Sequence, residues 1–117
     1  MKNSYRPLAC VACSLVLLAC GDRAEPGVTD GWLGLWNGPE GTFLRLDGSS
    51  GQYSVTIQDL DGPRTYAASA AGDHIEFERN GVKEAIRATN GVGTGMKWLA
   101  DKSDCLTIRP GEGFCRD

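Results

Sequence analysis

From about residue 31 onward, the chain alternates apolar and polar residues in short stretches, which end at glycine, proline, asparagine or aspartate. The clearest stretch is 52–58, where Tyr53, Val55 and Ile57 fall on one face and polar side chains fall on the other. A period of two residues is typical of a β-strand with one buried face. Comparable stretches occupy 32–36, 42–46, 64–70, 75–78, 82–89, 105–109 and 114–116. The pattern therefore predicts about eight short strands.

Turn signals separate these stretches. The strongest is Asn80-Gly81, because both residue types tolerate a positive φ and favour a tight hairpin. Further turns are expected at 47–51, 61–63, 71–73 and 110–113, and a glycine-rich loop at 90–95, whereas 96–100 fits either a short strand or one helical turn. Short strands joined by tight turns predict an all-β antiparallel meander that is closed or nearly closed into a barrel, with a two-sheet sandwich as the alternative.

The first 30 residues lack this alternation. Lys2 and Arg6 make the start of the chain positive, and an uncharged apolar run of 12 residues follows at 8–19. As a helix this run would rise about 18 Å, which is short of the ~30 Å hydrocarbon core of a membrane. A basic start, an apolar run of this length and a small residue at its end are typical of a secretory signal peptide.

The run ends in Leu17-Leu18-Ala19-Cys20, which resembles the lipobox of bacterial lipoproteins. The resemblance implies that residues 1–19 are removed and that Cys20 carries a thioether-linked diacylglycerol and, usually, a further acyl chain such as palmitate on its amino group. Gly21 after the cysteine implies, by analogy with enteric bacteria, the periplasmic face of the outer membrane, with the inner membrane as the alternative. The chain then divides into a signal peptide at 1–19, a lipidated and flexible tether at 20–30 and one β domain at 31–117.

Charge and glycine content refine this picture. The whole chain has 12 basic and 15 acidic side chains. Loss of Lys2 and Arg6 leaves 10 basic residues against 15 acidic ones, a net charge of −5. Such an acidic chain has no electrostatic attraction for nucleic acid or for an anionic membrane surface. All 16 glycines follow residue 20, and this density favours tight turns over long helices.

Two of the five cysteines leave with the predicted signal peptide and Cys20 takes the lipid, so Cys105 and Cys115 remain. Export places them in an oxidising compartment, and they flank a predicted turn. We therefore predict a structural disulfide between them. A metal or redox pair is the alternative, but Cys-x-x-Cys spacing is absent and His74 is the only histidine.

Gly34-Leu35-Trp36 resembles the Gly-x-Trp of lipocalins and related calycins, at the start of the first strand. The resemblance implies that Trp36 plugs one end of the barrel and that an arginine of a late strand packs over its ring. Arg109, in the last long predicted strand, is the arginine that could take this part. The mature chain as a whole also resembles small proteobacterial lipoproteins of unassigned function. Because it is shorter than a typical lipocalin, we expect side chains to fill much of the interior.

Motifs for catalysis are missing. The glycine-rich segment 91–97 lacks the Gly-Lys-Ser/Thr ending of a phosphate-binding loop, and 59–62 begins like a calcium loop that 63–65 does not continue. Asp73, Glu76 and Glu78 form an acidic cluster on a face that is expected to be solvated, and His74 has no evident serine or cysteine partner. We therefore predict no catalytic, cofactor-binding or metal-binding residues.

These observations favour a non-catalytic binding or interaction module, tethered to the membrane and meeting another envelope protein. One alternative is an inhibitor of the lysozyme-inhibitor type, because those are also small β-barrel lipoproteins with a disulfide. The Ser-Gly-x-x-Tyr loop of that class is absent, and the nearest stretch is 68–74. Two further candidates are a calycin that binds a small apolar ligand, and an enzyme that uses the acidic cluster with His74.

Overall fold

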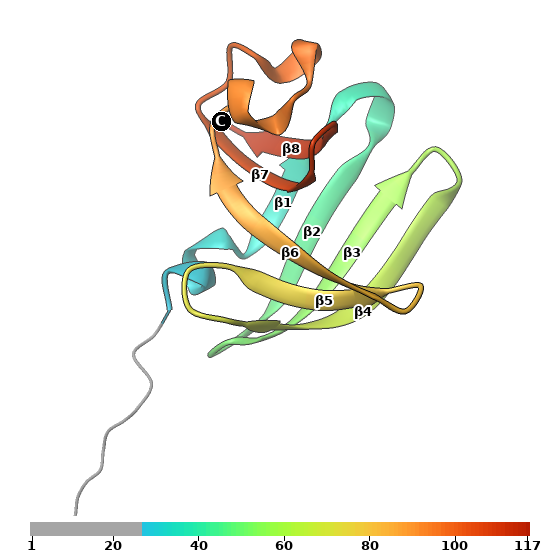
Figure 1. Cartoon of the computed structure of the whole chain (residues 1–117). Helices are drawn as coiled ribbons and strands as arrows, with labels where there is room; N and C mark the ends of the chain where they lie inside the picture. The colour runs from blue at the N-terminus through green and yellow to red at the C-terminus, as the bar shows by residue number, and fades with distance from the viewer. Residues whose placement is uncertain (1–26) are drawn as a thin grey trace, which may run out of the picture.

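Eight antiparallel strands, paired in chain order, form a closed barrel in the computed structural model, which describes residues 27–117 (Figure 1). The first strand also pairs with the last, at Asn37↔Cys115, and so closes the wall. The all-β meander barrel is thereby confirmed, and the sandwich alternative is wrong. The predicted signal peptide and Cys20 lie outside the described residues. The strands are β1 Gly34–Asn37, β2 Phe43–Ser49, β3 Gln52–Asp59, β4 Gly62–Ala70, β5 Ile75–Arg79, β6 Val82–Thr89, β7 Asp104–Arg109 and β8 Glu112–Arg116.

The alternation of the sequence matches the two faces of the wall. In β3, Val55 and Ile57 are buried, and they pair with Tyr66 and Arg64 of β4. Directly opposed residues of an antiparallel pair share a face, so the side chains of Tyr66 and Arg64 also point inward. Apolar side chains from all eight strands, and from Trp32 just before β1, fill most of the interior. The fully or nearly buried ones are Trp32, Trp36, Leu44, Leu46, Tyr53, Val55, Ile57, Ala68, Ile75, Phe77, Ile86, Leu106 and Phe114.

The hairpin between β5 and β6 turns at the predicted place. Asn80 and Gly81 have φ values of 55° and 80°, and positive φ at both positions is the signature of the two-residue turn that suits twisted strands. The β2–β3 hairpin is tighter than predicted, because β2 continues to Ser49 and only Ser50 and Gly51 form the turn. Local turn chemistry therefore locates the hairpins but not always the ends of their strands.

The start of the domain differs from the prediction. The expected strand at 32–36 begins only at Gly34, the first residue of β1, and Trp32 belongs instead to a 3-10 turn, η2 (Val28–Trp32). Gly34 has a φ of 114°, so the backbone changes direction between η2 and β1. Trp32 is buried at the end of the barrel that η2 covers, and its carbonyl accepts a 2.8 Å hydrogen bond from Trp36 Nε1. Tertiary packing of Trp32 thus overrides its strand-like spacing from Trp36.

Residues 28–30, which fall within the predicted tether, also pack against the barrel. Thr29 is fully buried, and its hydroxyl lies 2.9 Å from the hydroxyl of Tyr53. The Tyr53 hydroxyl donates to Asp30 Oδ1 at 2.5 Å. Burial, followed by the bond to the Asp30 carboxylate, raises the pKa of Tyr53 above its ordinary value. The segment η2 therefore closes this end of the barrel and belongs to the folded domain.

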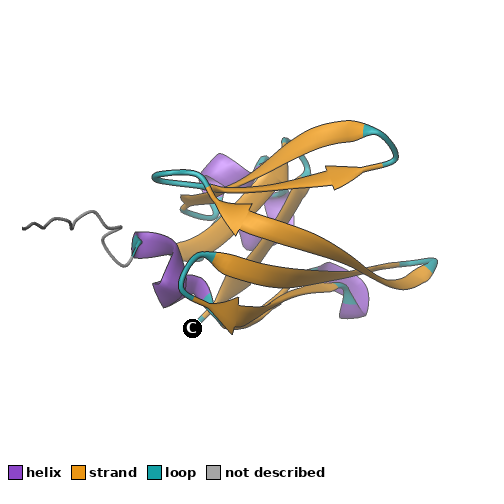
Figure 2. Cartoon of the chain, turned by 90° about the horizontal axis from the view of Figure 1, so that it is seen from below, coloured by secondary structure: helices purple, strands orange, loops and turns teal. Residues whose placement is uncertain are grey.

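The other helical segments are single 3-10 turns, η3 (Pro39–Gly41), η4 (Val92–Thr94) and η5 (Lys97–Leu99), which Figure 2 shows as short pieces around a wall of strands. Segment 96–100 is thus a helical turn. Within residues 27–117, no helix has the length and apolar character needed to cross a membrane.

The connection between β6 and β7 covers the outer face of the β7–β8 hairpin. Cys105 and Cys115 are directly opposed there and form the predicted disulfide, with their Cα atoms 4.0 Å apart. Leu99 and Met96 pack over the bridge. A Cβ on Gly91 would come within 1.6 Å of the Leu99 carbonyl oxygen, so this glycine permits close backbone packing. The segment from Met96 to Leu99, which follows the glycine-rich loop, thus covers the disulfide.

Candidate functional site

The interior of the barrel is charged at the end opposite η2. Strands β3 to β8 each place one charged side chain there, and these side chains are Asp59, Arg64, Arg79, Glu84, Arg109 and Glu112. We call these six residues the charged mouth. They surround a cavity of about 300 Å³ that is lined by Ile57, Asp59, Arg64, Tyr66, Arg79, Asn80, Arg109 and Glu112. The volume corresponds to about ten water molecules at ~30 Å³ each.

A local separation of two strands opens the mouth. β4 and β5 pair only at Ala68↔Phe77, Ser69↔Glu76 and Ala70↔Ile75. Beyond these pairs, β4 still extends to Gly62 and β5 to Arg79, and Figure 1 shows the β3–β4 and β5–β6 hairpins diverging. The divergence leaves Tyr66 and Arg64 of β4 facing the cavity, and the Tyr66 ring packs on Phe77 with a centroid distance of 5.3 Å.

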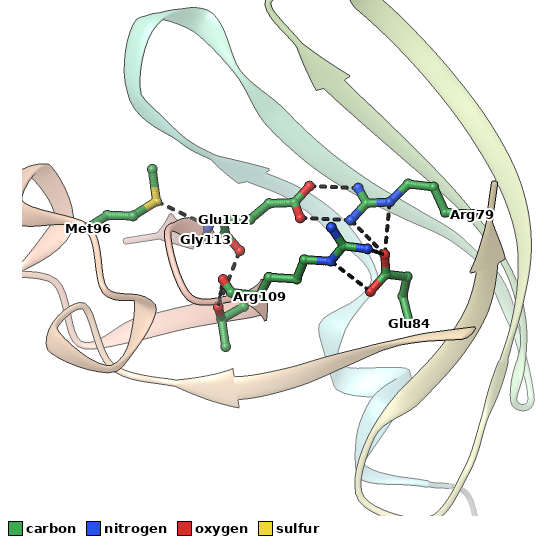
Figure 3. Close-up of polar contacts among 7 residues, drawn as sticks. Arg79, Glu84, Met96, Arg109, Glu112 and Gly113 are labelled. Atoms are coloured by element: carbon green, nitrogen blue, oxygen red, sulfur yellow. Dashed lines mark hydrogen bonds and ion pairs between the residues drawn. The ribbon is translucent and has the colours of Figure 1, made fainter. Parts of the chain in front are cut away.

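Four side chains of the mouth form a continuous ion-pair network (Figure 3). The Arg79 guanidinium donates to both carboxylate oxygens of Glu112, at 2.7 Å and 2.8 Å. The same guanidinium donates to Glu84 Oε2 from Nη2 at 3.0 Å and from Nε at 3.3 Å. Arg109 donates to Glu84 Oε1 from Nε at 3.1 Å, and its Nη2 contacts Glu84 Oε2. Charges therefore alternate along Glu112, Arg79, Glu84 and Arg109.

The network stabilises the charged forms of Glu84 and Arg79. Burial alone would raise the pKa of Glu84, whose side chain is 6% exposed, but the bonds from Arg109 and Arg79 outweigh it and lower that pKa. The bond to Glu112 is the main cause that raises the pKa of Arg79. Buried charges are costly unless they are paired, so Arg79 and Glu84, with side chains 15% and 6% exposed, depend on their charged neighbours. The mouth is thus a preformed and electrically balanced polar array.

Arg109 does not pack on Trp36, contrary to the expectation from the Gly-x-Trp resemblance. The guanidinium over the buried Trp36 ring is that of Arg116, 4.0 Å from the ring centroid. Arg116 also donates to Asp104 Oδ2 at 2.9 Å and to the Gly31 carbonyl at 3.0 Å. The tryptophan–arginine contact exists, but another arginine makes it.

A break in strand register explains why Arg109 lies elsewhere. The pairing of β7 with β8 shifts between Thr107 and Arg109, and such a bulge redirects the side chain that follows it. Ile108 still packs against the core, while Arg109 turns into the mouth and meets Glu84. Periodicity by itself does not predict such a shift.

His74 lies in the turn between β4 and β5, directly before β5 begins at Ile75, and it does not line the mouth. Its Nδ1 is 2.9 Å from Asp73 Oδ1 and its Nε2 is 3.0 Å from Glu76 Oε2. The bonds to Asp73 and then to Glu76 raise the pKa of His74. Both ring nitrogens are occupied by carboxylates, which leaves neither available as a base toward a nucleophile. Glu78 is exposed and takes no part in these contacts.

Within residues 27–117, no group of three histidine, cysteine, aspartate or glutamate side chains has the arrangement of a metal site.

Arg79, Glu84 and Glu112 belong to no motif that the sequence displays. A signal was nevertheless present, because a charged residue continued an inward-facing apolar row. Arg79 follows Ile75 and Phe77 at spacings of two, and Glu84 precedes Ile86 by two. In a closed barrel, a charge at an inward position must find a partner across the interior.

No protein family, curated protein or solved structure matches this chain.

Proposed function

We propose that this protein is a membrane-anchored, non-catalytic binding module of the cell envelope, and that its ligand is held in the charged mouth. One observation carries the proposal, namely a cavity of about 300 Å³ whose wall holds three arginines beside a buried, fully paired glutamate. Binding sites are typically concave and preformed, with a few convergent polar groups that set specificity.

The chemistry of the mouth favours binding over catalysis. Arginine stays protonated at physiological pH and so provides fixed positive charge and directed hydrogen-bond donors. Glu84 is held by two guanidiniums, and the bonds that stabilise its charged form remove its use as a proton acceptor. The lining also offers a phenol from Tyr66 and an amide from Asn80. Such a set recognises a polar or charged group and does not require a chemical step.

A small apolar ligand is a poorer match to this barrel. Apolar side chains fill the interior between the mouth and η2, and the lining of the cavity is dominated by charged residues. An apolar molecule there would displace water from the arginine donors without replacing its hydrogen bonds, which is unfavourable.

The lipobox at Cys20 supports the anchoring part of the proposal. Since η2 begins at Val28, only the seven residues 21–27 would link the lipid to the folded domain. Seven extended residues span at most about 25 Å, so the domain would stay beside the outer membrane, on its periplasmic face. Metabolic labelling with palmitate should mark the wild type and not Cys20→Ala. Labelling that persists in the variant would refute the anchor.

Affinity capture from the native envelope tests the binding part. The tagged, lipidated protein should recover a ligand or an envelope partner reproducibly, and Arg64→Glu should lose it. Arg45→Glu is the matched control, because Arg45 is an exposed strand arginine on the outer face of β2. Recovery that is equal with Arg64→Glu would remove the mouth from the proposal, and recovery of nothing would count against a binding module.

A further inference from the structure

We propose that the charged mouth recognises a carboxylate, which it holds between Arg109 and Arg64. This inference rests on the proposed function and specifies the ligand class of the same site. Acidic and basic side chains alternate across the mouth. Glu112 contacts Arg79, Arg79 contacts Glu84, and Glu84 contacts Arg109, so the row ends on a positive charge.

The two arginines of the network, Arg79 and Arg109, differ in how many hydrogen-bond donors remain free for a ligand. Arg79 donates from all three of its nitrogens to Glu112 and Glu84, and its side chain is only 15% exposed. Arg109 uses Nε and Nη2 for Glu84, whereas its Nη1 donates no hydrogen bond within residues 27–117. The Arg109 side chain is 55% exposed and lines the cavity. Arg109 therefore keeps the Nη1 donors free for a further acceptor.

Arg64 lies on the opposite wall of the same cavity. It pairs with the inward-facing Ile57 in the register of β3 and β4, so its side chain also faces inward. Within residues 27–117 it forms no ion pair. Asp59, the lining acid on the neighbouring strand β3, accepts a 2.8 Å bond from the Asp61 amide in the hairpin turn and forms no ion pair with Arg64 in the described part of the chain. A ligand anion between Arg109 and Arg64 would therefore continue the alternation of charge.

The charge and shape of the site favour a carboxylate over other anions. The six side chains of the mouth carry three positive and three negative charges, although Asp59 forms no ion pair with Arg64 within residues 27–117. A carboxylate would therefore add a single net negative charge to the mouth, whereas a phosphate near −2 would add two. The guanidinium forks of the mouth already hold two carboxylates through paired contacts, which is the geometry that planar acids suit best. The volume fits either an amino-acid-sized acid or the carboxyl terminus of a peptide.

Nuclear magnetic resonance of the ¹⁵N-labelled, lipidated protein in neutral detergent micelles tests this inference. N-acetylglycine should shift the Asn80 amide and the Nε–Hε signals of Arg64 and Arg109, and N-acetylglycinamide, which lacks the charge, should not. N-acetyl-alanyl-alanine represents a peptide terminus. Tighter binding of this dipeptide would support a peptide source, and equal binding would support a free small acid.

Other results of the same titrations would contradict the proposal of a carboxylate ligand. Tighter binding of inorganic phosphate, or equal binding of the glycinamide, would overturn the carboxylate while leaving a mouth that binds ligands. Absence of any shift with all four probes would also overturn it. The proposed function would still be judged by capture of the natural ligand, so the two failures can be told apart.

Variants separate recognition from structural support. Arg64→Gln should weaken binding of N-acetylglycine by roughly ten-fold or more, since a charge-assisted pair is lost, and Arg45→Gln should leave it unchanged. Glu84→Gln removes the internal competitor for Arg109 and should tighten binding several-fold. A network that only supports the fold would give no such opposite changes. Wild-type affinity in Arg64→Gln would refute the inference even if Glu84→Gln failed to fold.

Discussion

Removal of the disulfide with the double variant Cys105→Ala, Cys115→Ala should lower stability by an amount that the structure defines. The two residues face each other across β7 and β8, and their side chains are 0% and 4% exposed. The strands remain paired without the bridge, and Met96 and Leu99 still cover the site. We therefore expect the variant to fold and to differ from the wild type mainly in the freedom of its unfolded chain.

The magnitude follows from the length of the closed loop. The bridge joins positions separated by 10 in sequence, a loop of about 11 residues, for which the chain-entropy relation gives about 2.8 kcal/mol at 25 °C. At about 2.1 cal/mol/K per residue, the 91 described residues unfold with an entropy of about 0.19 kcal/mol/K. The ratio predicts a Tm lower by about 15 °C.

Thermal unfolding followed by circular dichroism, with and without dithiothreitol, measures this difference. The reductant should lower the Tm of the wild type toward that of the variant and leave the variant unchanged. Ser103→Ala, an exposed position just before β7, controls for substitution near the bridge. A variant Tm within about 5 °C of the wild type would refute the loop-entropy argument, and free thiols in the native, oxidised protein would refute the bridge itself.

Three further predictions concern the closed end and the turn between β4 and β5. Trp36→Ala should cost roughly 3–5 kcal/mol of unfolding free energy in urea titrations, because the ring is 1% exposed; a near-neutral value would contradict its packing. Arg116→Gln should cost about 1 kcal/mol through loss of the contact with that ring, and its cost should be smaller in the Trp36→Ala background, where only its bonds to Asp104 and Gly31 remain to be lost. Hydrogen bonds to Asp73 and Glu76 raise the pKa of His74 above its ordinary value of 6.5, so their stabilisation is complete below pH 6.5 and is lost as the pH rises through the folded pKa. Urea titrations at about pH 6 and about pH 9 should show this loss in the wild type and not in His74→Gln, and an equal pH dependence in both would show that His74 is not its source.

Local sequence determined much of the wall of the barrel. The two-residue period of 52–58 placed Val55 and Ile57 on the buried face, where the structure has them. Asn80-Gly81 fixed a hairpin, because both residues reach positive φ at low cost. The disulfide followed from elimination, since two cysteines remained at the ends of one short turn. These features depend on neighbours close in sequence, which is why the sequence reveals them.

The tertiary structure decided the closed end and the candidate site. Trp32 lies outside the expected strand because its ring packs into the closed end of the barrel and its carbonyl accepts a hydrogen bond from Trp36. Arg116 takes the place over Trp36 that the Gly-x-Trp resemblance implies for Arg109. The mouth joins Arg79 to Glu112 across 33 positions. Such pairing depends on barrel closure, on the separation of β4 from β5 and on a bulge in β7, and each of these is set by contacts between distant segments. Periodicity determines which face a residue occupies, but only closure of the barrel determines which residue it meets there.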